Sequence, residues 1–120
     1  MARAIIPIIK AVVRNEPSEA VLSNKLFTPL AADGGEINWQ EKDSSIVILA
    51  QNTASAEGKV TLIHGDGSSA MMDMDIPVPA SSTVCFNIDS ARFKNLTGDN
   101  RGKVLVSGPT TLSLAVFCTP

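Results

Sequence analysis

Runs of apolar residues separated by polar turns dominate the chain from about residue 37 to residue 118. The longest run, Ile46–Ala50, leads through a polar connection containing Gly58 into a second run, Val60–Ile63. Two β-rich runs joined by a short connection with a glycine predict an antiparallel hairpin. Because the first run shows no polar alternation, we expect a strand that is buried on both faces or central in a sandwich.

Alternation and turn signals predict the remaining elements. In residues 71–78, methionine and isoleucine alternate with Asp73 and Asp75, the pattern of a half-buried strand that ends at the prolines 77 and 79. Further strands are predicted at 37–39, 84–88, 104–106 and 112–116, a helical turn at 89–94 that turns Phe93 inward, and a short helix at 18–27 with Ser18 as a possible N-cap. About eight short strands with regular turns predict an all-β fold, a single antiparallel β-sandwich or jelly-roll-like domain.

The N-terminal segment Ala4–Val13 is rich in Ile and Val, which favours an extended strand. Pro7 cannot donate to a ladder, so this strand belongs at an edge or beside another chain. We therefore divide the chain into an N-terminal arm, residues 1–17, and a β-sandwich domain, residues 18–120. We expect the arm to extend from the body and pair with an adjacent subunit or a partner protein. The alternative is an edge strand of the same subunit's sandwich.

Composition narrows the classes of partner. The chain has 120 residues, of which 44% are apolar and 18% charged, enough for one core and too little charge for a disordered chain. A net charge of −2 with scattered basic residues argues against a nucleic-acid partner. The apolar N-terminal stretch is interrupted by Pro7 and Lys10 and is too short to span a bilayer, so we expect no membrane partner.

The candidate chemistry is sparse. His64 is the single histidine, which leaves no histidine metal triad, and no nucleophile-elbow motif is present. Asp66, Asp73 and Asp75 suggest calcium, but they lack the loop spacing of a calcium-binding hand, and a solvent-facing strand edge explains the last two. We expect a non-enzymatic protein with no catalytic residue, no cofactor and no metal ion.

The cysteines and the methionines can each be interpreted in two ways. Cys85 and Cys118 are expected to be reduced, small apolar packing residues, with a disulfide as the alternative. Met71, Met72 and Met74 are either adaptable core residues or a methionine-rich contact surface.

Five segments in order carry a resemblance to a known group of proteins. They are Thr-Pro-Leu-Ala-Ala-Asp-Gly-Gly at 28–35, Ile-Val-Ile-Leu-Ala-Gln-Asn-Thr at 46–53, Ile-Pro-Val-Pro-Ala-Ser-Ser-Thr-Val at 76–84, Ser-Ala-Arg-Phe-Lys at 90–94 and Leu-Ser-Leu-Ala-Val at 112–116. Together they resemble small structural proteins of tailed bacteriophages, notably the capsid decoration (cement) proteins. The resemblance spans about residues 28 to 118 and leaves out the N-terminal arm.

The resemblance implies a virion protein that is made in the host bacterial cytoplasm, binds the outer capsid surface and stabilises the assembled shell. The implied partners are the major capsid protein and further copies of the chain, as a homotrimer. The candidate partner-binding residues lie in the arm and in the Ser-Ala-Arg-Phe-Lys segment: Ile5, Ile6, Ile8, Ile9, Lys10, Val12, Arg92 and Lys94. The two cations either meet an acidic capsid surface or are simply solvated.

The rival function is a receptor- or carbohydrate-binding module of a phage fibre or a cell surface. Such a module needs exposed rings, and the chain offers one tryptophan, Trp39, four phenylalanines and no tyrosine.

Overall fold

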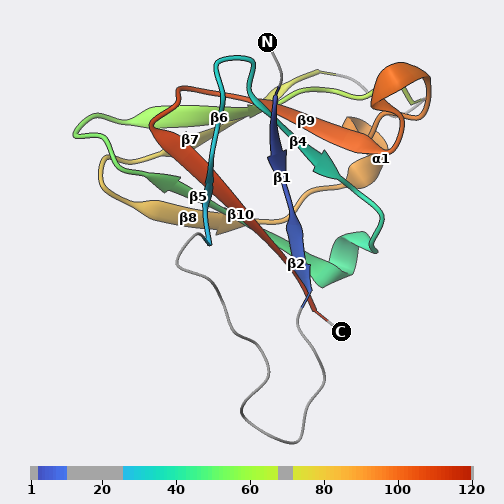
Figure 1. Ribbon diagram of the computed structural model, residues 1–120, viewed down its shortest axis with the longest axis horizontal. Helices are drawn as coiled ribbons and strands as arrows, with labels where there is room; N and C mark the ends of the chain where they lie inside the picture. Colours follow the sequence, from blue (N-terminus) through green and yellow to red (C-terminus); the bar gives the residue numbers. More distant parts are fainter. Residues whose placement is uncertain (1–2, 11–25, 68–71, 120) are drawn as a thin grey trace, which may run out of the picture.

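The computed structural model of the chain describes residues 3–10, 26–67 and 72–119, and Figure 1 shows two β-sheets stacked face to face. Sheet A has, in spatial order, β1 (Ala4–Ile6), β4 (Gly35–Asn38), β9 (Lys103–Ser107), β6 (Gly58–Leu62) and β7 (Met74–Val78). Sheet B has β2 (Ile8–Lys10), β10 (Leu112–Cys118), β5 (Ile46–Asn52) and β8 (Thr83–Phe86), and β3 (Thr28–Pro29) also pairs with β10. The helical pieces are α1 (Ser90–Phe93) and two 3₁₀ turns, η1 (Asp43–Ser45) and η2 (Gly98–Asn100). The predicted all-β sandwich is confirmed, but its sheets are mixed and not wholly antiparallel, because β1 and β2 pair in parallel with β4 and β10.

The core lies between the two sheets and is built from one side of each strand. On β5 the buried residues alternate, with Ile46, Ile48 and Ala50 fully enclosed and Val47 still 40% exposed. The largest enclosed side chains are Trp39 and Phe93. The apolar run Ile46–Ala50 is therefore a central strand, as expected, but its two faces differ in burial because only one of them faces the opposite sheet.

The predicted hairpin at 46–63 is wrong, because β5 and β6 belong to different sheets. Residues 53–57 carry the chain across the sandwich, which lets the apolar rows of both strands face the same core. Asn52, buried at the crossing, holds this connection. Its Nδ2 donates to the carbonyls of Ala56 (2.9 Å) and Val78 (3.0 Å), and its Oδ1 accepts the Ala54 N–H (2.9 Å).

The N-terminal segment does not extend from the body, so the prediction of a free arm is wrong for residues 4–10. β1 pairs in parallel with β4, β2 pairs in parallel with β10, and Pro7 lies where the chain passes from one sheet to the other. Ile6 is 2% exposed within the core. Residues 4–10 thus form a single extended segment that adds one strand to the edge at β4 and one to the edge at β10. Burial of its aliphatic side chains stabilises this pairing. Residues 4–10 therefore belong to the sandwich, as the alternative of an edge strand of the same subunit predicts.

Three local predictions are resolved at α1 and β7. The helical turn is confirmed with Phe93 1% exposed, but its N-cap is Asp89, whose carboxylate accepts the Ala91 N–H (2.9 Å). The alternation of the strand near residue 75 is confirmed, although Pro77 lies within β7 and does not end it. This fits because β7 is the outer strand of sheet A, where a missing N–H breaks no ladder. The helix predicted at 18–27 falls mainly outside the described residues.

Candidate interaction surface

The residues considered for catalysis or metal binding take part in local structure. His64 is exposed, and its backbone N–H (2.9 Å) and ring Nδ1 (2.7 Å) both contact Asp73 Oδ1. The bonds from His64, that of its backbone first, lower the pKa of Asp73. Among the described residues, no three His, Cys, Asp or Glu side chains gather as a metal site would require, and no helix there is long and apolar enough to cross a membrane.

The two other acids of the calcium hypothesis also bond within the chain. Asp66 accepts the Thr97 hydroxyl (2.5 Å) and the Leu96 N–H (2.6 Å), which lower its pKa, and it thereby fixes the loop after α1. Asp75 accepts the Thr61 hydroxyl at 2.7 Å on the outer side of sheet A. Asp66 thus holds a loop, Asp73 bonds His64, and Asp75 joins β6 to β7, so each carboxylate has its own partners within the chain.

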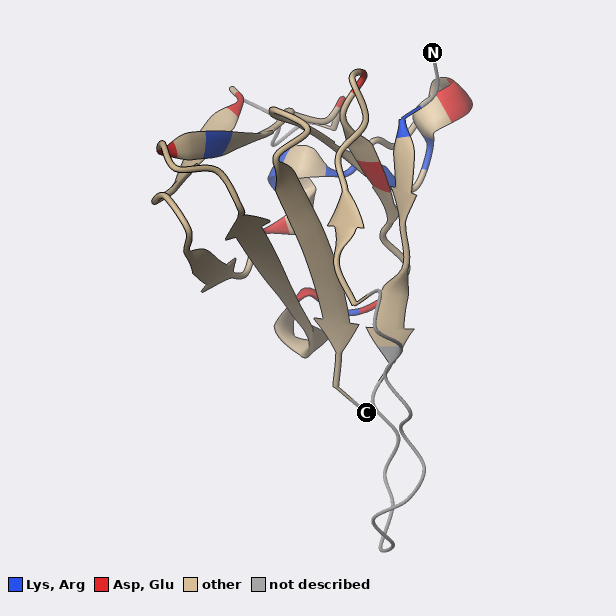
Figure 2. Ribbon diagram, turned by 60° about the vertical axis from the view of Figure 1, so that its left-hand side comes forward, with Lys and Arg blue, Asp and Glu red and all other residues tan. Residues whose placement is uncertain are grey.

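The outer side of sheet B differs from an ordinary solvent-facing sheet surface, because its three longest neighbouring strands carry no charge there. Strand register places Phe117 between Ile9 and Val47, and places Leu49 between its neighbours Ala115 and Cys85. We call this group the sheet B face, which consists of Ile9, Val47, Leu49, Cys85, Ala115 and Phe117. Val47 and Cys85 are exposed, Ile9, Leu49 and Phe117 are half-buried, and Ala115 is 1% exposed. Strands β5, β8 and β10 contain no Lys, Arg, Asp or Glu, and Figure 2 shows β10, the strand that ends at the C-terminus, in tan throughout.

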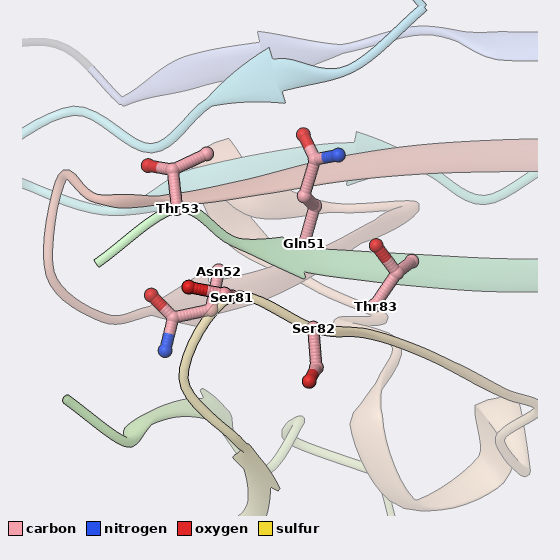
Figure 3. A pocket seen from close by; sticks show the side chains of 6 residues that line it. All are labelled: Gln51, Asn52, Thr53, Ser81, Ser82 and Thr83. Carbon is pink, nitrogen blue, oxygen red and sulfur yellow. The ribbon is translucent and has the colours of Figure 1, made fainter. Parts of the chain in front are cut away.

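The sheet B face ends in a neutral polar pocket (Figure 3). Its volume is about 320 Å³, and its lining is Gln51, Asn52, Thr53, Ser81, Ser82 and Thr83. Gln51 and Thr83 are partners across β5 and β8 and rise toward the same side. The Asn52 amide is already used in the crossing between sheets. Hydroxyl and amide groups alone can hydrogen-bond a neutral partner but supply neither an acid nor a base near neutral pH.

The structure separates the predicted partner-binding residues of the first strand segment. Ile5 points outward from β1 and is 75% exposed, Ile6 is in the core, and Ile8 packs against the core. Ile9 is half-buried on the sheet B face, and Lys10 ends β2. Val12 lies outside the described residues.

The predicted cations lie elsewhere. Arg92 is on α1 and Lys94 follows it, and the bridge between Lys94 and Val104 places them beside β9, two strands from β1. The Arg92 guanidinium lies 5.0 Å from the centre of the Phe93 ring. Its Nε is buried and has no hydrogen-bond partner within the described ranges. The structure therefore does not join the arm and these cations into one site.

The candidate sugar-stacking ring is also excluded. Trp39 is 1% exposed, and its indole N–H donates to Asp43 at 3.0 Å. Both cysteines are free thiols as expected, but only Cys118 is buried, whereas Cys85 is exposed. Of the methionines, Met74 packs against the core and Met72 is 64% exposed, while Met71 is not among the described residues.

Sequence reasoning missed the sheet B face. The signal was the run Ile46–Ala50 itself, in which Val47 and Leu49 are apolar although they fall on the side away from the core. The absence of charge from the final strand was the second signal. No family model, no curated protein and no solved structure matches this chain.

Proposed function

We propose that the chain is a non-enzymatic binding protein that docks onto another protein through the sheet B face. The observation that carries the proposal is the uncharged, largely apolar outer side of β5, β8 and β10. Apolar patches that face water on a small domain are typical of interaction sites. The centre of a protein interface is depleted in charge in the same way.

The specific form that we propose is capsid decoration in a tailed bacteriophage, supported by the resemblance of residues 28–118. The protein binds the major capsid protein on the outside of the assembled shell, as a homotrimer there. A ligand that binds only the assembled state stabilises it by mass action. Interfaces of about 1,600 Å² in total, repeated over neighbouring subunits, are sufficient without any chemistry.

Mixing the purified protein with expanded, undecorated capsids tests this proposal. The wild type is expected to co-sediment with capsids and to raise the temperature at which they disrupt. Val47→Lys places a charge on the sheet B face and is expected to remove binding. Ile5→Lys makes the same kind of change on the outer side of sheet A and is expected to bind normally.

Each result has a definite meaning. A wild-type protein that does not bind, or binds without a gain in heat resistance, contradicts capsid decoration. Equal binding by wild type and Val47→Lys contradicts the sheet B face as the docking surface.

A second candidate function is a receptor- or carbohydrate-binding module, favoured by the hydroxyl- and amide-lined pocket. Gln51 and Thr83 are the groups placed to bond a neutral polar ligand. Glycan-array binding that is lost in Gln51→Ala and kept in Val47→Lys would support this function over docking. Because Trp39 is buried, its substitution tests folding and not ligand binding.

A further inference from the structure

The outer strands of the two sheets differ in how they are protected. An outer strand exposes backbone N–H and C=O groups to other chains, and proline or charged residues there block added strands. Pro7 lies between the outer strands β1 and β2, and β2 contains Lys10. The outer strand β7 contains Asp75 and Pro77. The outer strand β8 reads Thr-Val-Cys-Phe and contains no such residue.

Strand β8 also pairs along one side only, with β5. Thr83 and Cys85 are exposed, and within the part of the chain that the structure describes no strand lies beyond β8 in sheet B. In an antiparallel pair, alternate residues direct their N–H and C=O groups away from the partner strand. Half of the backbone groups of β8 therefore point away from β5 and are available to a new strand.

We propose that β8 pairs with β8 of a second copy of this chain, antiparallel and about a two-fold axis. Sheet B then continues through both copies. Such a contact is closed, because each copy has one β8 edge and both edges are used in the pair, so pairing through β8 stops at two. The proposal goes beyond capsid decoration and concerns the protein free in solution.

The charges around β8 allow a second copy to pair there and favour one direction of pairing. The strand itself is neutral, so two copies meet without repulsion along its length. Two carboxylates lie beyond its C-terminal end: that of Asp89, and that of Asp43, which accepts the Ser90 N–H (2.9 Å). The N-terminal end has the neutral residues Ser81 and Ser82. Antiparallel pairing keeps the two acidic ends apart, whereas parallel pairing brings them together.

The geometry also places the two Cys85 residues on one face. Side chains alternate along a strand, so residues of the same number in an antiparallel two-fold pair point to the same side of the sheet. Cys85 points to the outer side, in line with Leu49. The sheet B faces of the two copies therefore become continuous across the axis.

The mass of the full-length protein, measured by sedimentation equilibrium over a range of concentrations, tests the proposal. We expect a reversible dimer. Cys85→Lys places two like charges together at the axis and is expected to weaken the dimer by more than about tenfold. Cys85→Ser, the matched neutral change, is expected to keep it, and Thr83→Lys provides a second charged variant if Cys85→Lys folds poorly by circular dichroism.

A short bis-maleimide reagent provides an independent readout, because it joins two thiols that lie close together. We expect a covalent dimer from the wild type and none from Cys85→Ser, since Cys118 is only 4% exposed. A monomer at all concentrations, a trimer, or a dimer unaffected by both charged variants would overturn the proposal. Val47→Lys, which acts on β5, is expected to remain dimeric, so failure of capsid docking and failure of β8 pairing are distinguishable.

Discussion

The outer sides of sheets A and B differ in charge, although sheet A also exposes Ile5 (75%) and the inner sides of both sheets contribute to one core. On sheet A, Lys103 Nζ lies 2.6 Å from Glu36, and Lys59 Nζ lies 3.2 Å from Asp75. On sheet B the corresponding positions of β5, β8 and β10 are apolar or neutral. Strands of a sheet with one face on the core and one face in solvent usually alternate apolar residues with polar or charged ones, and sheet A follows this pattern. Sheet B departs from that pattern, and the departure is what indicates a docking surface.

The largest loss of stability is expected from a substitution in the connection between β5 and β6, where the chain passes from one sheet to the other. Asn52→Ala removes the bond to the Val78 carbonyl, which joins the two sheets, and the bonds to the Ala56 carbonyl and the Ala54 N–H, which hold the connection. At about 0.5–1.5 kcal/mol for each bond, we expect a loss of about 2–4 kcal/mol. The midpoint of thermal unfolding should fall by about 10 °C.

The control is Gln51→Ala, one residue earlier and on the outer side of β5, which should change the midpoint little. Equal effects of the two substitutions would contradict the role given to Asn52.

The contrast between the sheets also explains what the sequence revealed of the fold. Strand positions were predictable because alternation is local, as at β7, where Met74 and Ile76 face the core and Asp75 faces water. The assignment of strands to sheets was not predictable in this way. A polar connection such as 53–57 fits a hairpin and a crossing equally well, and the buried role of Asn52 becomes clear only when Val78 lies beside it.

The candidate site was less predictable than the fold. An unbroken run such as Ile46–Ala50 indicates burial, but only the position of the opposite sheet decides which residues face out, so the run did not by itself show that Val47 and Leu49 are the outward pair. Pro7 correctly marked an edge, as β1 and β2 show. Pro7 did not indicate whether the segment pairs within its own subunit or with a neighbouring one. A strand of either subunit can form the same backbone hydrogen bonds with it.

Acid should weaken the junction between the sheets without acting through the sheet B face, which has no carboxylate. Burial raises the pKa of Asp43, but bonds from the Ser90 backbone (2.9 Å) and the Trp39 indole (3.0 Å) outweigh it and hold the pKa below 3.8. A carboxylate with a lowered pKa in the folded state stabilises the protein above its unfolded pKa, and this contribution disappears as the pH falls through the folded value. Asp43→Asn should therefore show a smaller loss of stability below about pH 4.

Removing the acceptor altogether gives the size of this contribution. In Asp43→Ala the buried Trp39 N–H loses its partner, which should cost about 1–3 kcal/mol at neutral pH in urea unfolding. Glu57→Ala, at an exposed position in the crossing loop, is the control and should change little. A pH profile of Asp43→Asn identical to that of the wild type would contradict this account.

The Glu36–Lys103 pair gives a smaller effect and measures what charge contributes to sheet A. Both side chains are partly buried, at 17% and 33% exposure. A double-mutant cycle with Glu36→Gln and Lys103→Met should give a coupling energy of about 0.5–1 kcal/mol. The coupling should shrink in about 1 M NaCl, since salt screens it. A coupling energy of zero would mean that these charges face water without adding to stability.

The smallest effect is expected at the exposed pair of sheet A, Lys59 and Asp75, whose side chains are 64% and 53% exposed. Lys59→Ala should change the free energy of unfolding by less than about 0.5 kcal/mol, because exposed ion pairs gain little against solvent. Val47→Thr, a mild polar change at a position 40% exposed on the sheet B face, should be nearly as small in thermal unfolding. The two variants should differ in capsid binding, which Lys59→Ala keeps and Val47→Thr weakens. If Lys59→Ala lost binding while Val47→Thr kept it, the charged face would be the docking surface, and the assignment of the two sheets would have to be exchanged.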